Sequence, residues 1–306
     1  MFLARLRTAV KISRPRFWLY LAGPWLVGWA LGMAHMGVGG AEDFLPLRGC
    51  PSFWMGLFFF LIPANFFLYG VNDFFDADTD AFNAKKGDKE ILLAEADRGR
   101  LRIALLITMA VSVGYYLTLH AWQAKLLFVA FFALSFFYSA QPFRFKARPV
   151  LDSASNILYG LPGILAYYVS VSMNGGARHA VPLPRVPVWV WMAVALWTAA
   201  MHLFSAIPDI EADQKAGLAT TATLLGKRKA LLLCFGLWLN MAFLLLTNTF
   251  ETRLGSSLPG IVAFGYPMIP MVILLRPDVD INRVYWAFPY INGFLGFGLF
   301  GWAVFY

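Results

Sequence analysis

The side chains best suited to chemistry in this chain are acids, and they gather at two places. Four aspartates follow the very apolar segment 53–72 within eight residues: Asp73, Asp76, Asp78 and Asp80. A second acidic group follows another apolar segment further along the chain: Asp209, Glu211 and Asp213. Carboxylates this close together repel one another and are costly near lipid, so each group is expected to bind something positive.

Each acidic group ends a polar stripe with helical spacing. In the first stripe, polar residues recur every three or four positions: Asn65, Tyr69, Asn72, Asp76 and Asp80, with Asp73 beside them. The second stripe has the same steps: His202, Ala206, Asp209 and Asp213. Residues at this spacing share one helix face, so we expect two polar ladders that face the protein interior and end in carboxylates. Because matching aspartates lie 133 positions apart, the sequence also predicts an internal repeat.

Hard oxygen ligands without a cluster of histidine or cysteine predict Mg²⁺. The predicted metal ligands come from both acidic groups: Asn72, Asp73, Asp76, Asp80, Asp209, Glu211 and Asp213. Mg²⁺ is often shared with substrate phosphates, and nearby basic residues would neutralise the remaining phosphate charge. The candidates are Lys85, Lys86, Lys89, Arg144, Lys146 and Lys215. The sequence has no glycine-rich phosphate loop, so a diphosphate is favoured over a nucleotide.

Composition shows what must position these groups. Of the 306 residues, 59% are hydrophobic and only 14% are charged, against about 25% charged in soluble domains. The chain is therefore predicted to be an all-α, polytopic membrane protein with about nine transmembrane helices. The predicted spans are 17–36, 53–72, 101–119, 123–140, 153–172, 187–207, 230–249, 258–275 and 284–305. We expect a single domain over 1–306, with four-helix halves at about 1–150 and 151–283 and an extra helix at 284–306.

The distribution of charge predicts the orientation of these spans. Twenty of the 25 lysines and arginines fall on one side of the predicted membrane, together with the N-terminus. By the positive-inside rule this side is cytoplasmic. The expected location is thus the cell (inner or plasma) membrane, with the acidic groups at the cytoplasmic side. The orientation of the spans accounts for the basic residues, so the net charge of +8 does not indicate a nucleic-acid partner.

A metal site at the lip of an apolar bundle suits a molecule with a diphosphate head and a hydrocarbon tail. The motif Asn72-Asp73-x-x-Asp76-x-x-x-Asp80, together with Asp209-x-Glu211-x-Asp213, resembles the UbiA superfamily of intramembrane prenyltransferases. Three further segments are similar to that family: "SRPRFWLY", "YSAQPFRFKARP" and "DQKAGLATTATLLG". The resemblance implies a bundle of helices around a central cavity, Mg²⁺ and ionisation of an allylic diphosphate. "NAKKGDKEILL" and "DSASNILYGLPG" resemble the lycopene elongase branch of C50 carotenoid synthesis.

The resulting expectation is an enzyme that transfers an isoprenyl group to a lipophilic acceptor. Dimethylallyl diphosphate is the favoured donor, and lycopene or a related carotenoid the favoured acceptor, in an elongase or hydratase reaction. No arginine or lysine lies deep in the apolar segments, which favours an uncharged acceptor. An aromatic acid or quinone precursor is the alternative acceptor. A divalent-cation transporter and a scaffold are alternatives of other classes, although a transporter would place its acids near the bilayer midplane.

The predicted roles cover the whole motif region. Catalytic roles are predicted for Asp76, Asp80, Asp209, Asp213 and Tyr69. Substrate contacts are predicted for Asn65, Asn72 and Asn156, in addition to the basic residues named above. Structural alternatives stand beside several of these predictions, because polar residues in spans often bond neighbouring helices. Asn65 and Tyr69 could do so, Asn156 could pair with Asp152, and His202 is typical of an interior histidine.

Overall fold

The structure is a computed structural model, and it describes residues 2–37, 50–76, 93–174, 185–249 and 257–305. Within these ranges every regular element is a helix. The first half contains α1 (Phe2–Ile12), η1 (Pro15–Phe17), α2 (Leu19–His35), α4 (Pro51–Leu61), α5 (Pro63–Phe75), α7 (Glu95–Thr118) and α8 (Trp122–Ser139). The elements from the loop after α8 to the second acidic group are η3 (Phe145–Ala147), α9 (Leu151–Ala154), η4 (Ser155–Tyr159), α10 (Leu161–Asn174), α11 (Val188–Ala206), η5 (Ile207–Asp209) and α12 (Ile210–Lys215). The chain ends with α13 (Thr221–Thr249), α14 (Leu258–Ala263), α15 (Gly265–Leu275) and α16 (Ile281–Phe305).

Eight helical segments in the described ranges are long and apolar enough to cross a membrane. The predicted all-α, multi-pass membrane fold is therefore confirmed, and the predicted count of nine spans is approximate. The predicted span 153–172 is the difference, because it is divided between α9, η4 and α10. The break falls at Gly160 and Pro162, and a proline disrupts the backbone hydrogen bonds of a continuous helix.

The second predicted span is also divided, at Pro63. Pro63 begins α5 directly after α4 ends, and its ring removes one backbone donor from the junction. The Asn65 side-chain amide donates to the carbonyls of Phe60 and Leu61, at 2.8 and 3.0 Å. These bonds satisfy acceptors that the break would otherwise leave without a partner.

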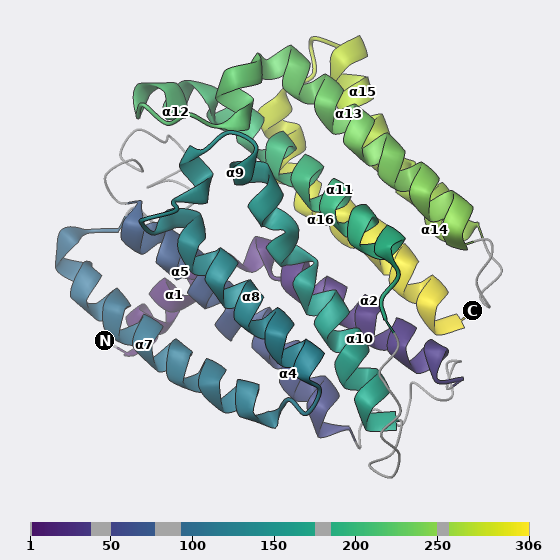
Figure 1. Ribbon diagram of the computed structural model, residues 1–306. Helices are drawn as coiled ribbons and strands as arrows, with labels where there is room; N and C mark the ends of the chain where they lie inside the picture. Colours follow the sequence, from purple (N-terminus) through teal and green to yellow (C-terminus); the bar gives the residue numbers. More distant parts are fainter. Residues whose placement is uncertain (1, 38–49, 77–92, 175–184, 250–256, 306) are drawn as a thin grey trace.

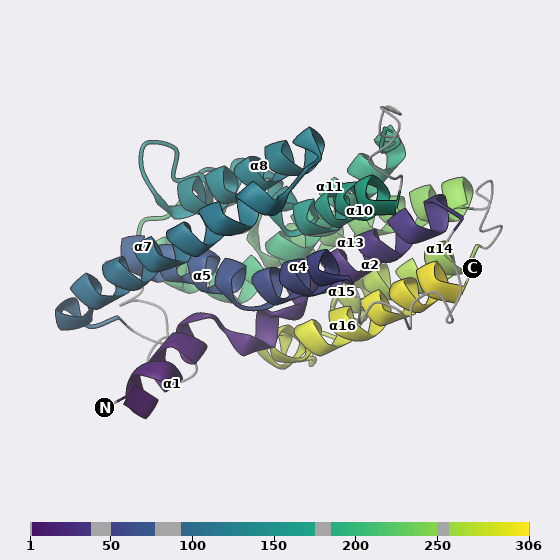
Figure 2. The ribbon, with the colours of Figure 1, turned by 90° about the horizontal axis from the view of Figure 1, so that it is seen from below.

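The long helices pack side by side into one bundle, while α1 lies apart from it at one end (Figures 1 and 2). The buried core is aromatic, and its largest fully buried side chains include Trp25, Trp29 and Phe60 in the first half and Trp238 in the second. Helices α2 and α10 approach closely at glycine. A Cβ added to Gly28 would lie 1.8 Å from the Gly163 carbonyl oxygen, and such small residues are what close helix packing in membranes requires.

The C-terminal end of α5, the short helix α12 and the start of α9 lie at the same end of the bundle (Figure 1). The two acidic groups, far apart in sequence, are thereby brought to one end.

Candidate active site

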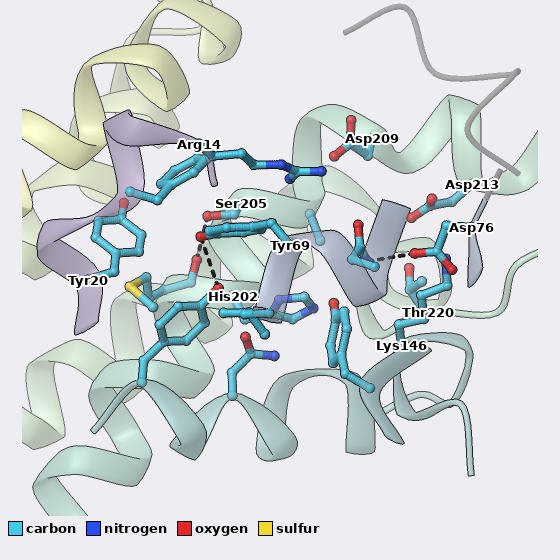
Figure 3. Close-up of a pocket in the computed structure, with 18 of the residues that line it drawn as sticks. Arg14, Tyr20, Tyr69, Asp76, Lys146, His202, Ser205, Asp209, Asp213 and Thr220 are labelled. Atoms are coloured by element: carbon cyan, nitrogen blue, oxygen red, sulfur yellow. Dashed lines mark hydrogen bonds and ion pairs between the residues drawn. The ribbon is translucent and has the colours of Figure 1, made fainter. Parts of the chain in front are cut away.

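A pocket opens at this end of the bundle and is lined by both halves of the chain. Seven of the predicted functional residues line it: Tyr69, Asn72, Asp76, Lys146, Asn156, Asp209 and Asp213. Figure 3 shows Asp76, Asp209 and Asp213 gathered on one side of the pocket, with Tyr69 and His202 further in and Tyr20 at the opposite side. The arrangement separates a charged end from a tyrosine-rich interior.

Asp76 is built into the wall of this pocket. It caps the C-terminus of α5 and is 1% exposed. Asn72 Nδ2 donates to Asp76 Oδ2 at 2.6 Å, Ser139 Oγ donates to the same oxygen at 3.1 Å, and the Lys146 ammonium pairs with the other oxygen. Burial raises the pKa of the Asp76 carboxyl above its usual value, and the Lys146 charge opposes part of that rise.

Asp73 lies beside the stripe and has a different partner. It is 1% exposed and does not line the pocket. Arg14 donates to Asp73 Oδ1 at 2.9 Å, and the Arg14 guanidinium also stacks over the Tyr69 ring at 4.7 Å. Because Arg14 lines the pocket, the segment before α2 contributes a cation to the wall.

The second acidic group sits on a bent segment. Pro208 lies within the short 3₁₀ turn η5, so α11 does not continue straight through the motif. Asp209 ends that turn and Asp213 lies one helical turn further on in α12, and both line the pocket. Glu211 and Lys215 are exposed and do not line it.

The interior of the pocket is formed by rings and small polar groups. The tyrosines that line it are Tyr20, Tyr69, Tyr138, Tyr159 and Tyr285. The Tyr69 and Tyr159 hydroxyls lie 3.3 Å apart. His202 and Ser205 of α11 also line the pocket. Tyrosine rings exclude water, and their faces carry negative charge density that attracts a cation.

Comparison with known proteins agrees with this geometry. The family model of the UbiA prenyltransferases matches residues 26–288. The chain belongs to the UbiA prenyltransferase family. It is 39% identical to a lycopene elongase/hydratase of Haloferax volcanii over 292 residues, which cover 95% of this chain and 87% of that protein. It is 40% identical to a lycopene elongase/hydratase of Halobacterium salinarum, over 93% of this chain and 92% of that protein.

Solved UbiA structures have the same fold. A UbiA homolog from Archaeoglobus fulgidus bound to DMAPP and Mg²⁺ matches with a TM-score of 0.69 at 22% identity, over 97% of this chain and 99% of the other. An apo structure of a UbiA homolog from Aeropyrum pernix matches with a TM-score of 0.64 at 17% identity, over 92% and 97%. The predicted UbiA family and prenyltransferase activity are confirmed, and the transporter and scaffold alternatives are set aside.

Only some of the metal ligands predicted from the UbiA motifs line the pocket. Asp76, Asp209 and Asp213 share the pocket, while Asp80 lies outside the described residues. Among residues that the structure describes, no three side chains of histidine, cysteine, aspartate or glutamate come close enough to hold a metal ion. The three aspartates that line the pocket offer carboxylate oxygens as ligands, and such ligands fit Mg²⁺.

Several predicted substrate contacts lie elsewhere. Asn65 is fully buried at the α4–α5 junction, as the structural alternative expects. Arg144 does not line the pocket. Lys85, Lys86 and Lys89, like Asp78, lie outside the described residues. The roles assigned to all these side chains stay predictions.

Asn156 bonds to Asp152 and lies at the pocket, and its predicted contact with substrate stays a prediction. Its side-chain amide donates to the Asp152 carbonyl, and it lines the pocket. The Asp152 carboxylate is fully buried and accepts a hydrogen bond from the Thr221 backbone N–H at 2.7 Å. This bond ties the start of α9 to the start of α13, the helix that follows the second acidic group.

Some lining residues were missed by the sequence analysis. The main ones are Arg14, Tyr20, Tyr138, Tyr159 and Thr220. Each belongs to a segment that resembles the UbiA family or its elongase branch, so the signal was present at the level of segments. The individual positions could not be chosen because the segments are short and their contacts are made between helices.

Proposed function

We propose that this UbiA-family protein transfers an isoprenyl group from an allylic diphosphate to lycopene or a related carotenoid, in an elongase/hydratase reaction. The observation that carries the proposal is the single pocket that joins Asp76, Asp209 and Asp213 to a tyrosine-rich interior. The named activity of the relatives supports the choice of acceptor. The twenty-to-five distribution of basic residues supports a cytoplasmic site and N-terminus in the cell membrane.

At the charged end, Asp76, Asp209 and Asp213 would hold Mg²⁺, with Asn72 beside them. Bound Mg²⁺ supplies positive charge against the charge that develops on a leaving diphosphate. Lys146 and Arg14 add two cations of the chain itself to the same wall. Lys146 pairs with Asp76, and Arg14 pairs with Asp73. A bound diphosphate would therefore compete with these carboxylates for hydrogen bonds from the two cations.

The reaction begins when the bond between the allylic carbon and the diphosphate oxygen breaks, and the diphosphate leaves with the electron pair. The Tyr69 and Tyr159 side chains line the pocket, where aromatic rings would stabilise an allylic cation and exclude water. A double bond of the acceptor then attacks the cation. The new cation on the acceptor ends by loss of a proton or by capture of water.

The pocket interior favours an uncharged acceptor. Among the lining residues, the charged side chains are Arg14, Asp76, Lys146, Asp209 and Asp213. All five are assigned here to the metal and the diphosphate. A hydroxybenzoate would need a further cationic partner for its carboxylate, because an unpaired buried charge is costly. A carotenoid has no charge and needs only an apolar surface.

The test is the mass of the pigment. Purified protein with Mg²⁺, dimethylallyl diphosphate and lycopene is expected to yield carotenoid enlarged by one or two five-carbon units. Hydroxybenzoate replaces lycopene in a parallel reaction. Unchanged lycopene together with prenylated hydroxybenzoate would overturn the carotenoid acceptor and leave the family assignment intact.

A further inference from the structure

We propose that His202 accepts the proton of the water molecule that ends the reaction, and so determines how much of the product carries a hydroxyl group. The inference rests on the proposed function and adds a residue and a step to it.

The position of His202 suits a late step. It precedes Asp209 by seven residues on α11 and η5, which corresponds to about 10 Å along a helix. Both side chains line the same pocket, and Figure 3 shows His202 inside it, away from the three aspartates. A donor whose diphosphate lies at the aspartates would direct its hydrocarbon group toward His202. The carbon–carbon bond to the acceptor would then form between the aspartates and His202.

The surroundings of His202 leave its ring nitrogens able to form hydrogen bonds with a small molecule. The ring is in edge contact with Tyr138, with centroids 5.9 Å apart. Within the described part of the chain, no hydrogen bond to the His202 side chain is present, although the side chain is partly exposed at the pocket. Its neighbour Ser205 donates its own proton to the Met201 carbonyl at 2.8 Å. The Ser205 oxygen is therefore left to accept a hydrogen bond from water.

The chemistry of the other lining side chains singles out His202. Histidine is the residue that most often accepts a proton near neutral pH. The interior tyrosines, Ser205 and Asn156 are weak bases, and Lys146 and Arg14 are cations. The aspartates are assigned to the metal. Among the residues that line the pocket, His202 is thus the one base available away from the diphosphate.

Attack by the acceptor double bond forms one carbon–carbon bond and leaves a tertiary cation on the carotenoid. In hydration, the oxygen of a water molecule bonds to that carbon, one O–H bond breaks, and the proton moves to an imidazole nitrogen of His202. Without the base, the cation instead loses a proton from a neighbouring carbon to the departed diphosphate, and the product is an alkene.

The experiment measures the fraction of prenylated carotenoid that is hydroxylated, by mass, for wild type, His202→Gln and His202→Phe. We expect the hydroxylated fraction to fall about tenfold or more, because a positioned base speeds the step it assists by about 10²–10⁴-fold. His35→Gln is the matched control, because His35 makes the same 5.9 Å edge contact with Tyr167 and does not line the pocket. It should leave the fraction unchanged.

Other outcomes are distinguishable. An unchanged hydroxylated fraction in both variants overturns the role of His202. Wild-type product that is prenylated but never hydroxylated overturns it as well. Both outcomes leave the proposed function standing. No prenylated carotenoid from wild type removes the proposed function and this inference with it. Should neither variant accumulate in the membrane, wild type in D₂O decides. A lower hydroxylated fraction is expected if a water proton moves in the product-determining step, and an unchanged fraction overturns the proposal.

Discussion

Asp76 and Asp209 occupy matching positions in the two acidic motifs, yet their surroundings differ. Asp76 is 1% exposed, ends a regular helix and pairs with Lys146. Asp209 is only partly buried and ends a 3₁₀ turn that contains Pro208. The first motif also buries Asp73 against Arg14. In the second motif the position that matches Asp73 is Ala206, and the additional acid, Glu211, is exposed.

The difference indicates a division of labour between the motifs. Buried carboxylates need their own cations, because an unpaired buried charge costs several kcal/mol, and α5 meets this need within the folded chain. The carboxylates of Asp209 and Asp213 are only partly buried, so their charges keep more of their hydration. We therefore expect the first motif to contribute more to folding than the second, and both to serve chemistry.

The largest expected effect is that of metal removal. Excess EDTA should abolish turnover, and added Mg²⁺ should restore it, because a diphosphate leaves poorly without a cation. The melting temperature should change little, since Arg14 and Lys146 already neutralise the buried motif. Turnover and thermal unfolding are measured on the same detergent-purified sample. Full activity in excess chelator would remove the metal from the proposed function.

Next are the two matched aspartates. Asp76→Asn and Asp209→Asn should each lower turnover by about 10²–10³-fold, the range found when one electrostatic stabiliser of a transition state is removed. They should differ in stability. Asp76→Asn leaves a mostly buried ammonium, that of Lys146, without its carboxylate, so this variant should melt earlier than Asp209→Asn. Equal melting temperatures would show that the two motifs contribute alike to folding.

A third, smaller effect isolates the folding role of the first motif. Asp73→Asn removes a carboxylate that pairs with Arg14, whose side chain is 15% exposed, and should destabilise the protein by about 3 kcal/mol. Asp97→Asn is the matched control, because Asp97 pairs with Arg100 at the same 2.9 Å but on the surface. It should cost less than about 1 kcal/mol. Unfolding in denaturant compares the two variants, and equal losses would contradict a buried, structural pair.

The sequence predicted the acidic motifs and the membrane fold well because both depend on local composition and spacing. The stripe from Tyr69 to Asp76 is a property of a single helix, and its lining residues follow from helical period alone. The family resemblance extended this to the whole bundle. Asp76 and Asp209 line one pocket, while the internal repeat stays a prediction.

Features that depend on breaks and on contacts between helices were not predictable. Asn65 has the spacing of a site residue, but the break at Pro63 gives its amide two backbone carbonyls to bond. Tyr159 meets Tyr69 across ninety positions of sequence. In each case tertiary geometry decides which of two locally reasonable roles a residue takes.

The smallest expected effect concerns Glu211, which the sequence places among the metal ligands. Its side chain is exposed and does not line the pocket, and charges in water are strongly screened. Glu211→Gln should therefore lower turnover by less than about threefold, against 10²-fold or more for Asp209→Asn. Initial rates at saturating Mg²⁺ and donor compare the two variants on one helix turn. A Glu211→Gln variant as inactive as Asp209→Asn would mean that α12 turns toward the pocket when substrate binds, and the second motif would then use three acids, as the sequence predicted.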